Sequence, residues 1–366
     1  MIIAAHIDPS KQHPSFLLES ISGLAKQYRE NHFIIFSDKE TIATAKFTDN
    51  CTLVTISPVI KNSLLLHYWY QYKLPALLTM YNAAIFISEN SVCSLQTNTA
   101  QVMVIKDDFL QDKKNPLKNK YCRYLKRNFS KFAVKAAAIC VTKAFIGLKL
   151  IEHYNILAKK TTTILHGIEK AYQPINIDNK ETILAKYTEG HEFFVCECSS
   201  ITASNLITLL KAFSIFKKRL KSGMQLVLIN KLNHNPIKDF HIYKYRQEVQ
   251  IIPYESKFTE ASIIAAAYAG IFLPAFISAQ NWGLQCLQSM VPLITTDDEN
   301  NRTIYEDAVI YAPIDEKKIA EYMMLLYKDE TYRNVYIKKG QEIANLYNQE
   351  ESNQRLWQTI LGCYPN

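Results

Sequence analysis

Glycine is scarce in this sequence: nine of its 366 residues are glycine. Neither GxGxxG nor GxxxxGK occurs, so the chain carries no dinucleotide-binding fingerprint and no P-loop. Long apolar runs are missing too; because no stretch reaches about 18 apolar residues, no transmembrane helix is expected. The apolar start at residues 1–5 has no basic residue and is too short for a signal peptide, so it is predicted to be a buried strand.

Closely spaced cysteines are nearly absent. Of the eight cysteines, only Cys196 and Cys198 lie close together, and their spacing fits no common zinc pattern. We therefore expect reduced, buried thiols, as in a cytosolic protein, and no metal site. The formal charge of +8 is a moderate basic excess. Such an excess suits an anionic ligand or a membrane surface and does not indicate DNA binding.

The hydrophobic content of 48% over 366 residues is enough for two cores, so two domains are expected. Residues 1–36 follow the order strand, loop, helix, strand, and this order recurs at 193–229 and 271–295. A strand–helix–strand crossover within one sheet requires parallel strands. The sequence therefore predicts an α/β protein with doubly wound, parallel sheets.

The stretch 261–295 is the most informative of these repeats. A small-residue helix at 261–268 precedes a strand at 271–273, a loop at 274–280 and a helix that starts at Asn281. In parallel sheets, ligands bind in the loop after a strand, where free N–H groups of the next helix attract anions. Gly283 in the first helical turn would let a ligand approach the backbone closely.

The residues at 280–288, QNWGLQCLQ, resemble the signature Glu-Gly-Phe-Gly-Leu-Pro-x-Leu-Glu. This signature belongs to the retaining GT-B glycosyltransferases of the glycogen-synthase-like group (glycosyl transferases group 1, family 4-like). Both family glutamates are glutamines here, Gln280 and Gln288. Through the order of its elements, the resemblance extends over nearly the whole chain.

The resemblance implies a set of site residues. Asp107 matches a family aspartate after an apolar strand, Lys106 stands where the family has histidine, and Gln280 replaces the first glutamate; these are the catalytic candidates. The Arg-Lys pair that holds the donor diphosphate in the family falls on Ala203 and Ser204. The donor-binding candidates are Asn281, Trp282, Gly283, Leu284, Gln288, Ser204 and Lys231.

In the resembling family, the loop after the first strand faces the acceptor and the donor phosphates. Here this loop holds His6, Asp8, Lys11 and His13 and has no glycine. Two interpretations stay open: Lys11 or His13 contacts the donor phosphates, or the loop is simply solvated.

The resemblance also implies the architecture: a GT-B fold with two Rossmann-like domains facing each other across a cleft. We expect an acceptor-side domain at 1–172, a nucleotide-sugar-side domain at 173–345, and a C-terminal helix at 346–366 that crosses back to the first domain. The family needs no metal, so no cofactor is expected; the donor would be a nucleotide sugar such as a UDP- or GDP-sugar.

Three functions are compatible with these residues. The first is transfer of a sugar to a glycan or lipid-linked acceptor, with an altered donor site in which Lys231, Lys143 or Lys106 replaces the missing cations. The second is a GT-B-shaped pseudoenzyme, acting as partner or scaffold in glycan or polysaccharide assembly. It is motivated by Gln280, Gln288, Ala203 and Ser204 together. The third is a small-ligand binder with another doubly wound fold.

Residues 113–135 are the most basic stretch of the chain and carry interleaved tyrosines and phenylalanines. On a helix they would form a basic, partly aromatic face of the kind that lies on anionic membranes. A solvated surface helix is the alternative, and nucleic-acid binding is not expected. We therefore expect a cytoplasmic protein, with peripheral contact at the inner membrane surface as an open alternative.

Overall fold

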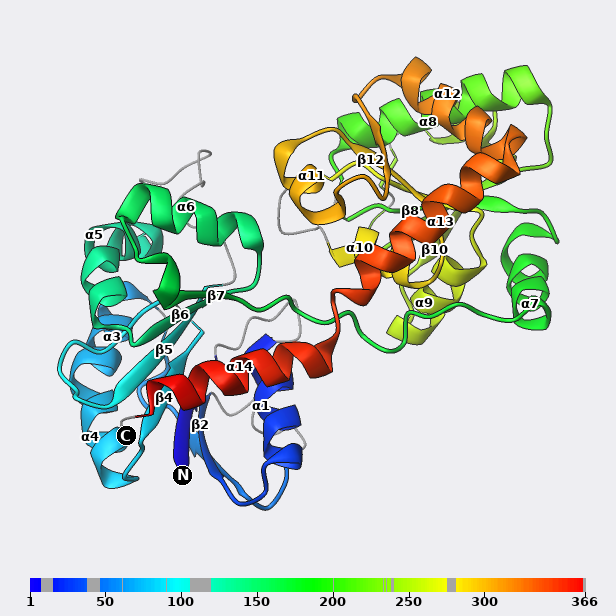
Figure 1. Ribbon diagram of the computed structural model, residues 1–366. Coiled ribbons are helices and arrows are strands. Elements are labelled where there is room, and N and C mark those ends of the chain that lie inside the picture. The colour runs from blue at the N-terminus through cyan, green and yellow to red at the C-terminus, as the bar shows by residue number, and fades with distance from the viewer. Residues whose placement is uncertain are drawn as a thin grey trace. The chain divides into compact units, whose positions relative to one another are not determined.

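The structure is a computed structural model that describes residues 1–7, 16–37, 47–60, 62–89, 91–105, 120–199, 201–232, 234, 236–237, 240–274 and 281–364. The chain forms two compact units. Unit 1 comprises residues 1–167 and 348–366, and unit 2 comprises residues 168–347. Each unit is built on one parallel sheet and is described by itself (Figure 1).

Unit 1 contains a seven-stranded sheet in the order β3-β2-β1-β4-β5-β6-β7, and each strand pair is parallel. The strands are β1 (Ile2–His6), β2 (His32–Ser37), β3 (Cys51–Thr55), β4 (Ile85–Ser88), β5 (Ala100–Ile105), β6 (Ala138–Val141) and β7 (Thr161–Thr163). Most central positions are buried, as expected for apolar runs covered on both faces.

The helices of unit 1 come from both ends of the chain. They are α1 (Phe16–Gln27), α3 (Ser63–Tyr68), α4 (Leu74–Met80), α5 (Lys120–Lys135), α6 (Ala144–Tyr154) and α14 (Gln349–Cys363). In Figure 1 the C-terminal α14 runs beside α1. The ring of Trp357 stacks on Tyr28 with centroids 4.1 Å apart. The expected return of the last helix to the first domain is thereby confirmed.

The sequence predicts one helix over 64–78, but the structure inserts a π-helical segment, η1 (Trp69–Lys73), between α3 and α4. The N–H of Leu74 reaches the carbonyl of Trp69, five residues back. Pro75 follows directly, and a proline has no N–H to continue the regular ladder. The wider turn leaves three consecutive side chains buried: Trp69, Tyr70 and Gln71.

Unit 2 contains a six-stranded parallel sheet in the order β10-β9-β8-β11-β12-β13. The strands are β8 (Phe193–Glu197), β9 (Gln225–Asn230), β10 (Val249–Pro253), β11 (Ala269–Phe272), β12 (Leu293–Thr296) and β13 (Ile310–Ala312). The predicted α/β class with two parallel sheets is confirmed by these two sheets.

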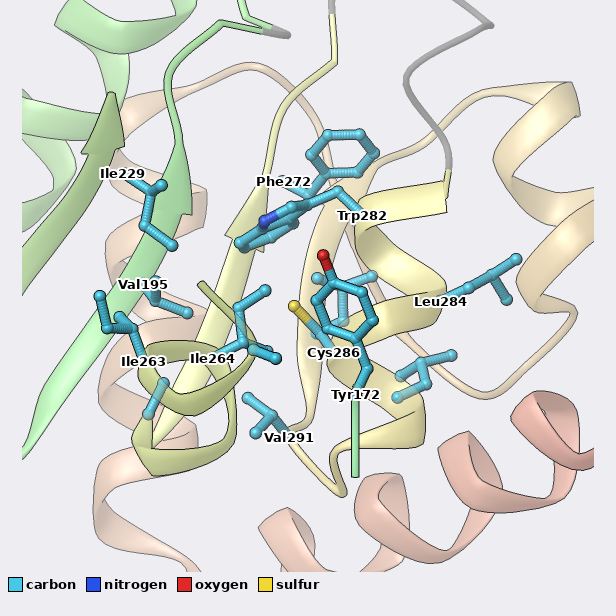
Figure 2. Packing of buried hydrophobic residues seen from close by; sticks show 14 of the residues in the cluster. Tyr172, Val195, Ile229, Ile263, Ile264, Phe272, Trp282, Leu284, Cys286 and Val291 are labelled. Atoms are coloured by element: carbon cyan, nitrogen blue, oxygen red, sulfur yellow. The ribbon is translucent and has the colours of Figure 1, made fainter. Parts of the chain in front are cut away.

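The helices of unit 2 are α7 (Ile177–Thr188), α8 (Ala203–Leu220), α9 (Lys257–Ala266), α10 (Asn281–Gln288), α11 (Glu299–Tyr305), α12 (Glu316–Lys328) and α13 (Glu330–Asn345). The elements α7, α11 and β13 were not predicted, because their sequence patterns are short or mostly polar. Two buried hydrophobic clusters form the core of this unit, one of which appears in Figure 2. In the described part of the chain, no helix is both long and apolar enough to cross a membrane.

Candidate functional site

The strand order of unit 2 changes direction between β8 and β11. From β8 the chain continues to β9 and β10 on one side, and from β11 it continues to β12 and β13 on the other. In open parallel sheets, ligands bind outside the carboxyl ends of the strands at such a reversal. The starts of α8 and α10 follow these two strand ends, so we take this edge as the candidate site.

The start of α8 presents backbone N–H groups at this edge. Thr202 caps the helix, and its side chain accepts a hydrogen bond from the N–H of Asn205 at 3.1 Å. Asn205 Nδ2 donates to the carbonyl of Leu273 at 3.1 Å, which ties α8 to the end of β11. Ala203 and Ser204 are exposed and form the first helical turn, whose N–H groups have no acceptor within the helix. An anion at this place would accept those N–H groups at the positive end of the helix dipole.

Two predicted donor-binding residues of α10 lie in the core of unit 2. Trp282 is 4% exposed, and its ring lies 5.5 Å from that of Phe272 (Figure 2). Leu284 is also 4% exposed. The indole Nε1 of Trp282 is buried and donates no hydrogen bond to the described residues. Packing therefore accounts for both side chains, and their part in donor binding stays a prediction.

Gly283 is surrounded by protein atoms on the side where a side chain would point. A Cβ at this position would lie 2.3 Å from the hydroxyl of Tyr305 and 2.9 Å from Cδ2 of Leu293. Tyr305 and Leu293 are fully buried, so neither can move aside easily. The absence of a side chain at Gly283 thus lets α10 pack against β12 and α11. This packing role is independent of any ligand contact with the backbone of Gly283.

The Gly283→Ala variant is expected to lose about 2–3 kcal/mol of stability, because the added methyl overpacks a rigid part of the core. Chemical denaturation of the full chain measures this loss. Gly362→Ala is the matched control, since a Cβ there meets no atom within 4 Å and alanine favours a helix. A Gly283→Ala variant as stable as the wild type, with weaker donor binding, would instead assign this glycine to the ligand.

Gln288, the second glutamine of the family-like signature, ends α10. Its side chain is half-buried, and its Oε1 atom is buried without a hydrogen-bond donor among the described residues. A buried acceptor without a donor costs about 1–3 kcal/mol. If the amide turned toward a ligand hydroxyl, its oxygen would lose no hydrogen bond to the described residues and would gain one from the ligand.

Lys231, at the end of β9, is held by a carboxylate. Its Nζ lies 2.7 Å from Oε1 of Glu260, which is 3% exposed, and 5.1 Å from the centre of the Tyr254 ring. The other oxygen of Glu260 accepts a hydrogen bond from the hydroxyl of Tyr172 at 3.2 Å. Burial, followed by the nearby Glu260 carboxylate, raises the pKa of Tyr172 and keeps that hydroxyl protonated. The charge of Lys231 is therefore already compensated by Glu260. In the predicted contact with the donor, Lys231 would be shared between Glu260 and the donor phosphates.

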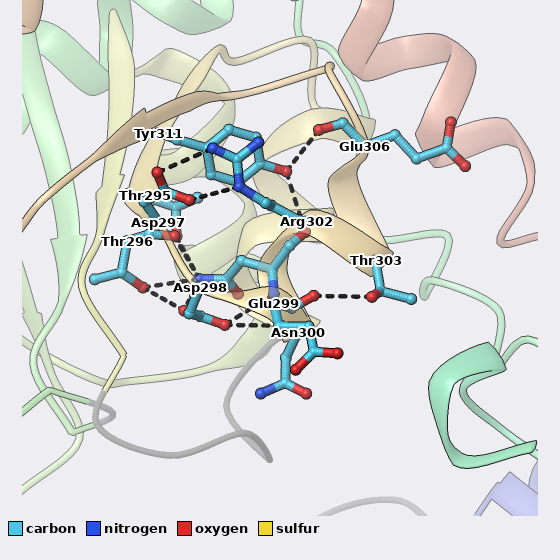
Figure 3. Close-up of polar contacts among 11 residues, drawn as sticks. Thr295, Thr296, Asp297, Asp298, Glu299, Asn300, Arg302, Thr303, Glu306 and Tyr311 are labelled. Carbon is cyan, nitrogen blue, oxygen red and sulfur yellow. Dashed lines mark hydrogen bonds and ion pairs between the residues drawn. The ribbon is translucent and has the colours of Figure 1, made fainter. Parts of the chain in front are cut away.

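The turn after β12 carries further carboxylates (Figure 3). Asp298 caps α11 by accepting the N–H groups of Asn300 and Asn301. Asp297 forms two hydrogen bonds with Arg302, at 2.6 and 2.9 Å. The hydrogen bond from Arg302 holds the pKa of Asp297 below its usual range.

The end of β8 is acidic as well, because the buried Glu197 accepts the N–H of Ser199 at 2.6 Å. Lys257, at the start of α9, pairs with Glu169. Three cations that follow strand ends of this sheet, Lys231, Lys257 and Arg302, are thus each paired with a carboxylate.

Several predicted residues lie outside the described part of the chain. They are the catalytic candidates Lys106, Asp107 and Gln280, the side chain of Asn281, and the loop residues Asp8, Lys11 and His13. Lys143, which was predicted to replace one of the missing donor-site cations, is the N-cap residue of α6. It is not free, because it already has an interaction partner.

Unit 1 has its own reversal of strand order, between β1 and β4, and a buried polar chain lies there. The hydroxyl of Tyr70 lies 2.7 Å from Nδ1 of His6, at the end of β1, and 2.9 Å from Oγ of Ser88, at the end of β4. Beside them, Glu89 accepts the N–H of Leu17 in the first turn of α1 at 3.1 Å. Sequence reasoning missed this chain. Its only local signal was a histidine at the end of a predicted buried strand.

No protein-family model matches the sequence, and no curated protein matches it. Solved structures do match over the full length. A glycosyltransferase from Rickettsia africae is 12% identical, with a TM-score of 0.72, over 100% of this chain and 99% of the other. Anabaena Alr3699/HepE in complex with UDP-glucose is 13% identical, with a TM-score of 0.71, over 99% of each chain.

A third similar structure is a putative UDP-N-acetylglucosamine 2-epimerase from Listeria monocytogenes. It is 9% identical, with a TM-score of 0.62, over 98% of this chain and 95% of the other. At such low identities the likeness concerns the fold alone. The chain therefore has the GT-B fold, and because both transferases and an epimerase are similar to it, its reaction must be argued from its residues.

Proposed function

We propose that this protein is a GT-B glycosyltransferase that moves a sugar from a nucleotide sugar to a glycan or lipid-linked acceptor. The proposal includes membership of the retaining, glycogen-synthase-like group, a donor site altered at Gln280, Gln288 and Ser204, and no need for a metal. UDP-glucose is bound by the similar Anabaena protein, which makes a UDP-sugar the first donor to test.

The observation that carries the proposal is the side-chain oxygen of Gln288, which accepts no hydrogen bond from the described residues. This oxygen belongs to the last residue of α10, a short helix whose first residue follows the strand reversal where α/β proteins bind ligands. A ribose or sugar hydroxyl of the donor would supply the missing hydrogen bond. An amide can both accept and donate such bonds, so the replacement of glutamate by glutamine keeps this form of recognition.

In this proposal the diphosphate of the donor binds at the start of α8. In the transfer step, the bond between the anomeric carbon and the diphosphate oxygen breaks, and its electron pair stays on the diphosphate. The acceptor hydroxyl forms the new bond to that carbon, and its proton passes to the departing diphosphate. The N–H groups of Ala203 and Ser204 would stabilise the growing negative charge, in place of the family's Arg-Lys pair. Lys106, Asp107 and Gln280 remain the catalytic candidates.

Calorimetric titration of the full chain with UDP, UDP-glucose, GDP and ADP tests this proposal. We expect the uridine ligands to bind, and we expect Gln288→Leu to weaken UDP-glucose roughly 3- to 10-fold, the worth of one hydrogen bond. Gln285→Leu, on the same helix, is the matched control and should change the affinity less than 2-fold. No binding by any nucleotide at millimolar concentration would refute the proposal.

The alternative is a GT-B protein without transfer activity that serves as a partner in glycan assembly. One observation favours it: Lys231, Lys257 and Arg302 are each neutralised by a carboxylate, and Glu197 is buried at the site. Such an edge offers little charge to a departing diphosphate. Nucleotide binding accompanied by slow hydrolysis of UDP-glucose supports the transferase; the absence of both supports the partner.

A further inference from the structure

A strip of exposed apolar and aromatic side chains runs along α3 and η1 in unit 1. Leu64 is 80% exposed, Tyr68 43% and Tyr72 66%, and they follow each other at intervals of four residues. The rings of Tyr68 and Tyr72 stack with centroids 5.9 Å apart. Exposed side chains of this size that line up on one face indicate an interaction surface.

The helix α5 lies beside α3 and adds positive charge to the strip. The two are joined by a hydrogen bond of 3.1 Å between Nδ1 of His67 and the hydroxyl of Tyr124. The sequence of α5, KYCRYLKRNFSKFAVK, contains six lysines and arginines and no acidic residue. Residues 62–82, which carry the strip, contain one lysine and no acidic residue. Arg123, Arg127 and Lys131 are exposed at a spacing of four residues.

We propose that this face, made of Leu64, Tyr68, Tyr72, Arg123, Arg127 and Lys131, docks on an anionic lipid bilayer. Tyrosines prefer the headgroup region, where their rings are partly buried and their hydroxyls stay wet. The cations are attracted to anionic headgroups. An apolar strip beside a helix that carries basic and no acidic residues is complementary to a membrane surface with negatively charged headgroups.

Exposed aliphatic side chains distinguish this face from a nucleic-acid-binding site. Leu64 and, on the exposed side of α5, Val134 are 80% and 79% exposed and have no ring on which a base could stack. Both would gain by entering the acyl boundary of a bilayer. The proposal does not depend on donor binding, so its test is carried out without any nucleotide sugar.

Co-sedimentation of the full chain with lipid vesicles tests the proposal. We expect binding to phosphatidylcholine vesicles that contain phosphatidylglycerol, no binding to phosphatidylcholine alone, and weaker binding at about 0.5 M salt. The variant Arg123→Gln/Arg127→Gln/Lys131→Gln should weaken binding on the order of 100-fold, since three cations leave the surface. Its thermal melting curve verifies that it still folds.

The matched control is Lys211→Gln/Lys218→Gln/Arg219→Gln, which removes the same charge from exposed positions of α8 in unit 2. It should change vesicle binding less than 3-fold. Tyr68→Ser/Tyr72→Ser keeps all cations and should weaken binding about 10-fold by removing the aromatic anchors. Equal losses in the α5 and α8 variants would overturn the proposal. So would unchanged binding of the tyrosine variant, or binding of single-stranded RNA but of neither vesicle.

Discussion

Replacing Lys231 by methionine is expected to lower the free energy of unfolding of unit 2 by about 3 kcal/mol. The carboxylate of Glu260 is 3% exposed, and in this variant the hydroxyl of Tyr172, 3.2 Å away, is the partner that it keeps among the described residues. A buried charge without its counter-ion costs about 3–5 kcal/mol; the low end applies because Lys231 is itself 34% exposed and water can enter. Hydrogen exchange of amides in β9 and α9, followed by mass spectrometry, measures the change within this unit.

A second substitution tests the cause. Lys231→Met/Glu260→Gln removes the isolated charge, keeps an oxygen for Tyr172, and should recover about 2 kcal/mol. Lys257→Met is the matched control: in its pair with Glu169 the two side chains are 40% and 27% exposed, so water reaches both charges and the loss should stay below about 1 kcal/mol. A double variant less stable than the single one would disprove the buried ion pair as the source of the effect.

Acid is expected to destabilise unit 1 through His6. Burial lowers the pKa of His6 from 6.5 to about 3. Below pH 6.5 the unfolded chain therefore binds a proton at this residue that the folded chain does not, so stability falls as the pH falls toward 3. The slope approaches about 1.4 kcal/mol per pH unit well below pH 6.5, and the total loss between pH 6.5 and 4.5 is about 2.3 kcal/mol. Above about pH 7.5 both states hold a neutral His6, and the residue contributes almost no pH dependence.

Urea denaturation at several pH values compares the wild type with His6→Gln. The variant loses the packing of His6 against Trp69, whose ring lies 4.7 Å away, so it is less stable at pH 7. The difference between the two proteins should nevertheless shrink as the pH is lowered from 6.5 to 4.5. His153→Gln, at an exposed position of α6, serves as the control. A constant difference between wild type and His6→Gln would show that His6 becomes protonated in the folded protein.

These two predictions concern contacts that no inspection of the sequence could supply. His6 meets Tyr70 across 64 positions, and Ser88 completes the chain only because β1 and β4 are neighbours in the sheet. Lys231 could be named as a candidate cation, but its pairing with Glu260 depends on how α9 packs beside the end of β9. Gly283 depends on the fold in the same way: the sequence predicts a ligand close to its backbone, which stays a prediction, and only the folded chain shows that Tyr305 fills the place of the missing side chain.

The positions of most strands and of the long helices, such as α12 at Glu316–Lys328, could be predicted from hydrophobic periodicity alone. That pattern is a local property, because each element must present its apolar side to a core. The resemblance at 280–288 likewise led to the GT-B fold without any coordinates. The state of the candidate site was settled only in three dimensions, since burial and charge pairing join residues that are distant along the chain. Folding pairs Lys231 and Arg302 with carboxylates and buries Trp282, and among the described residues it gives the oxygen of Gln288 no donor.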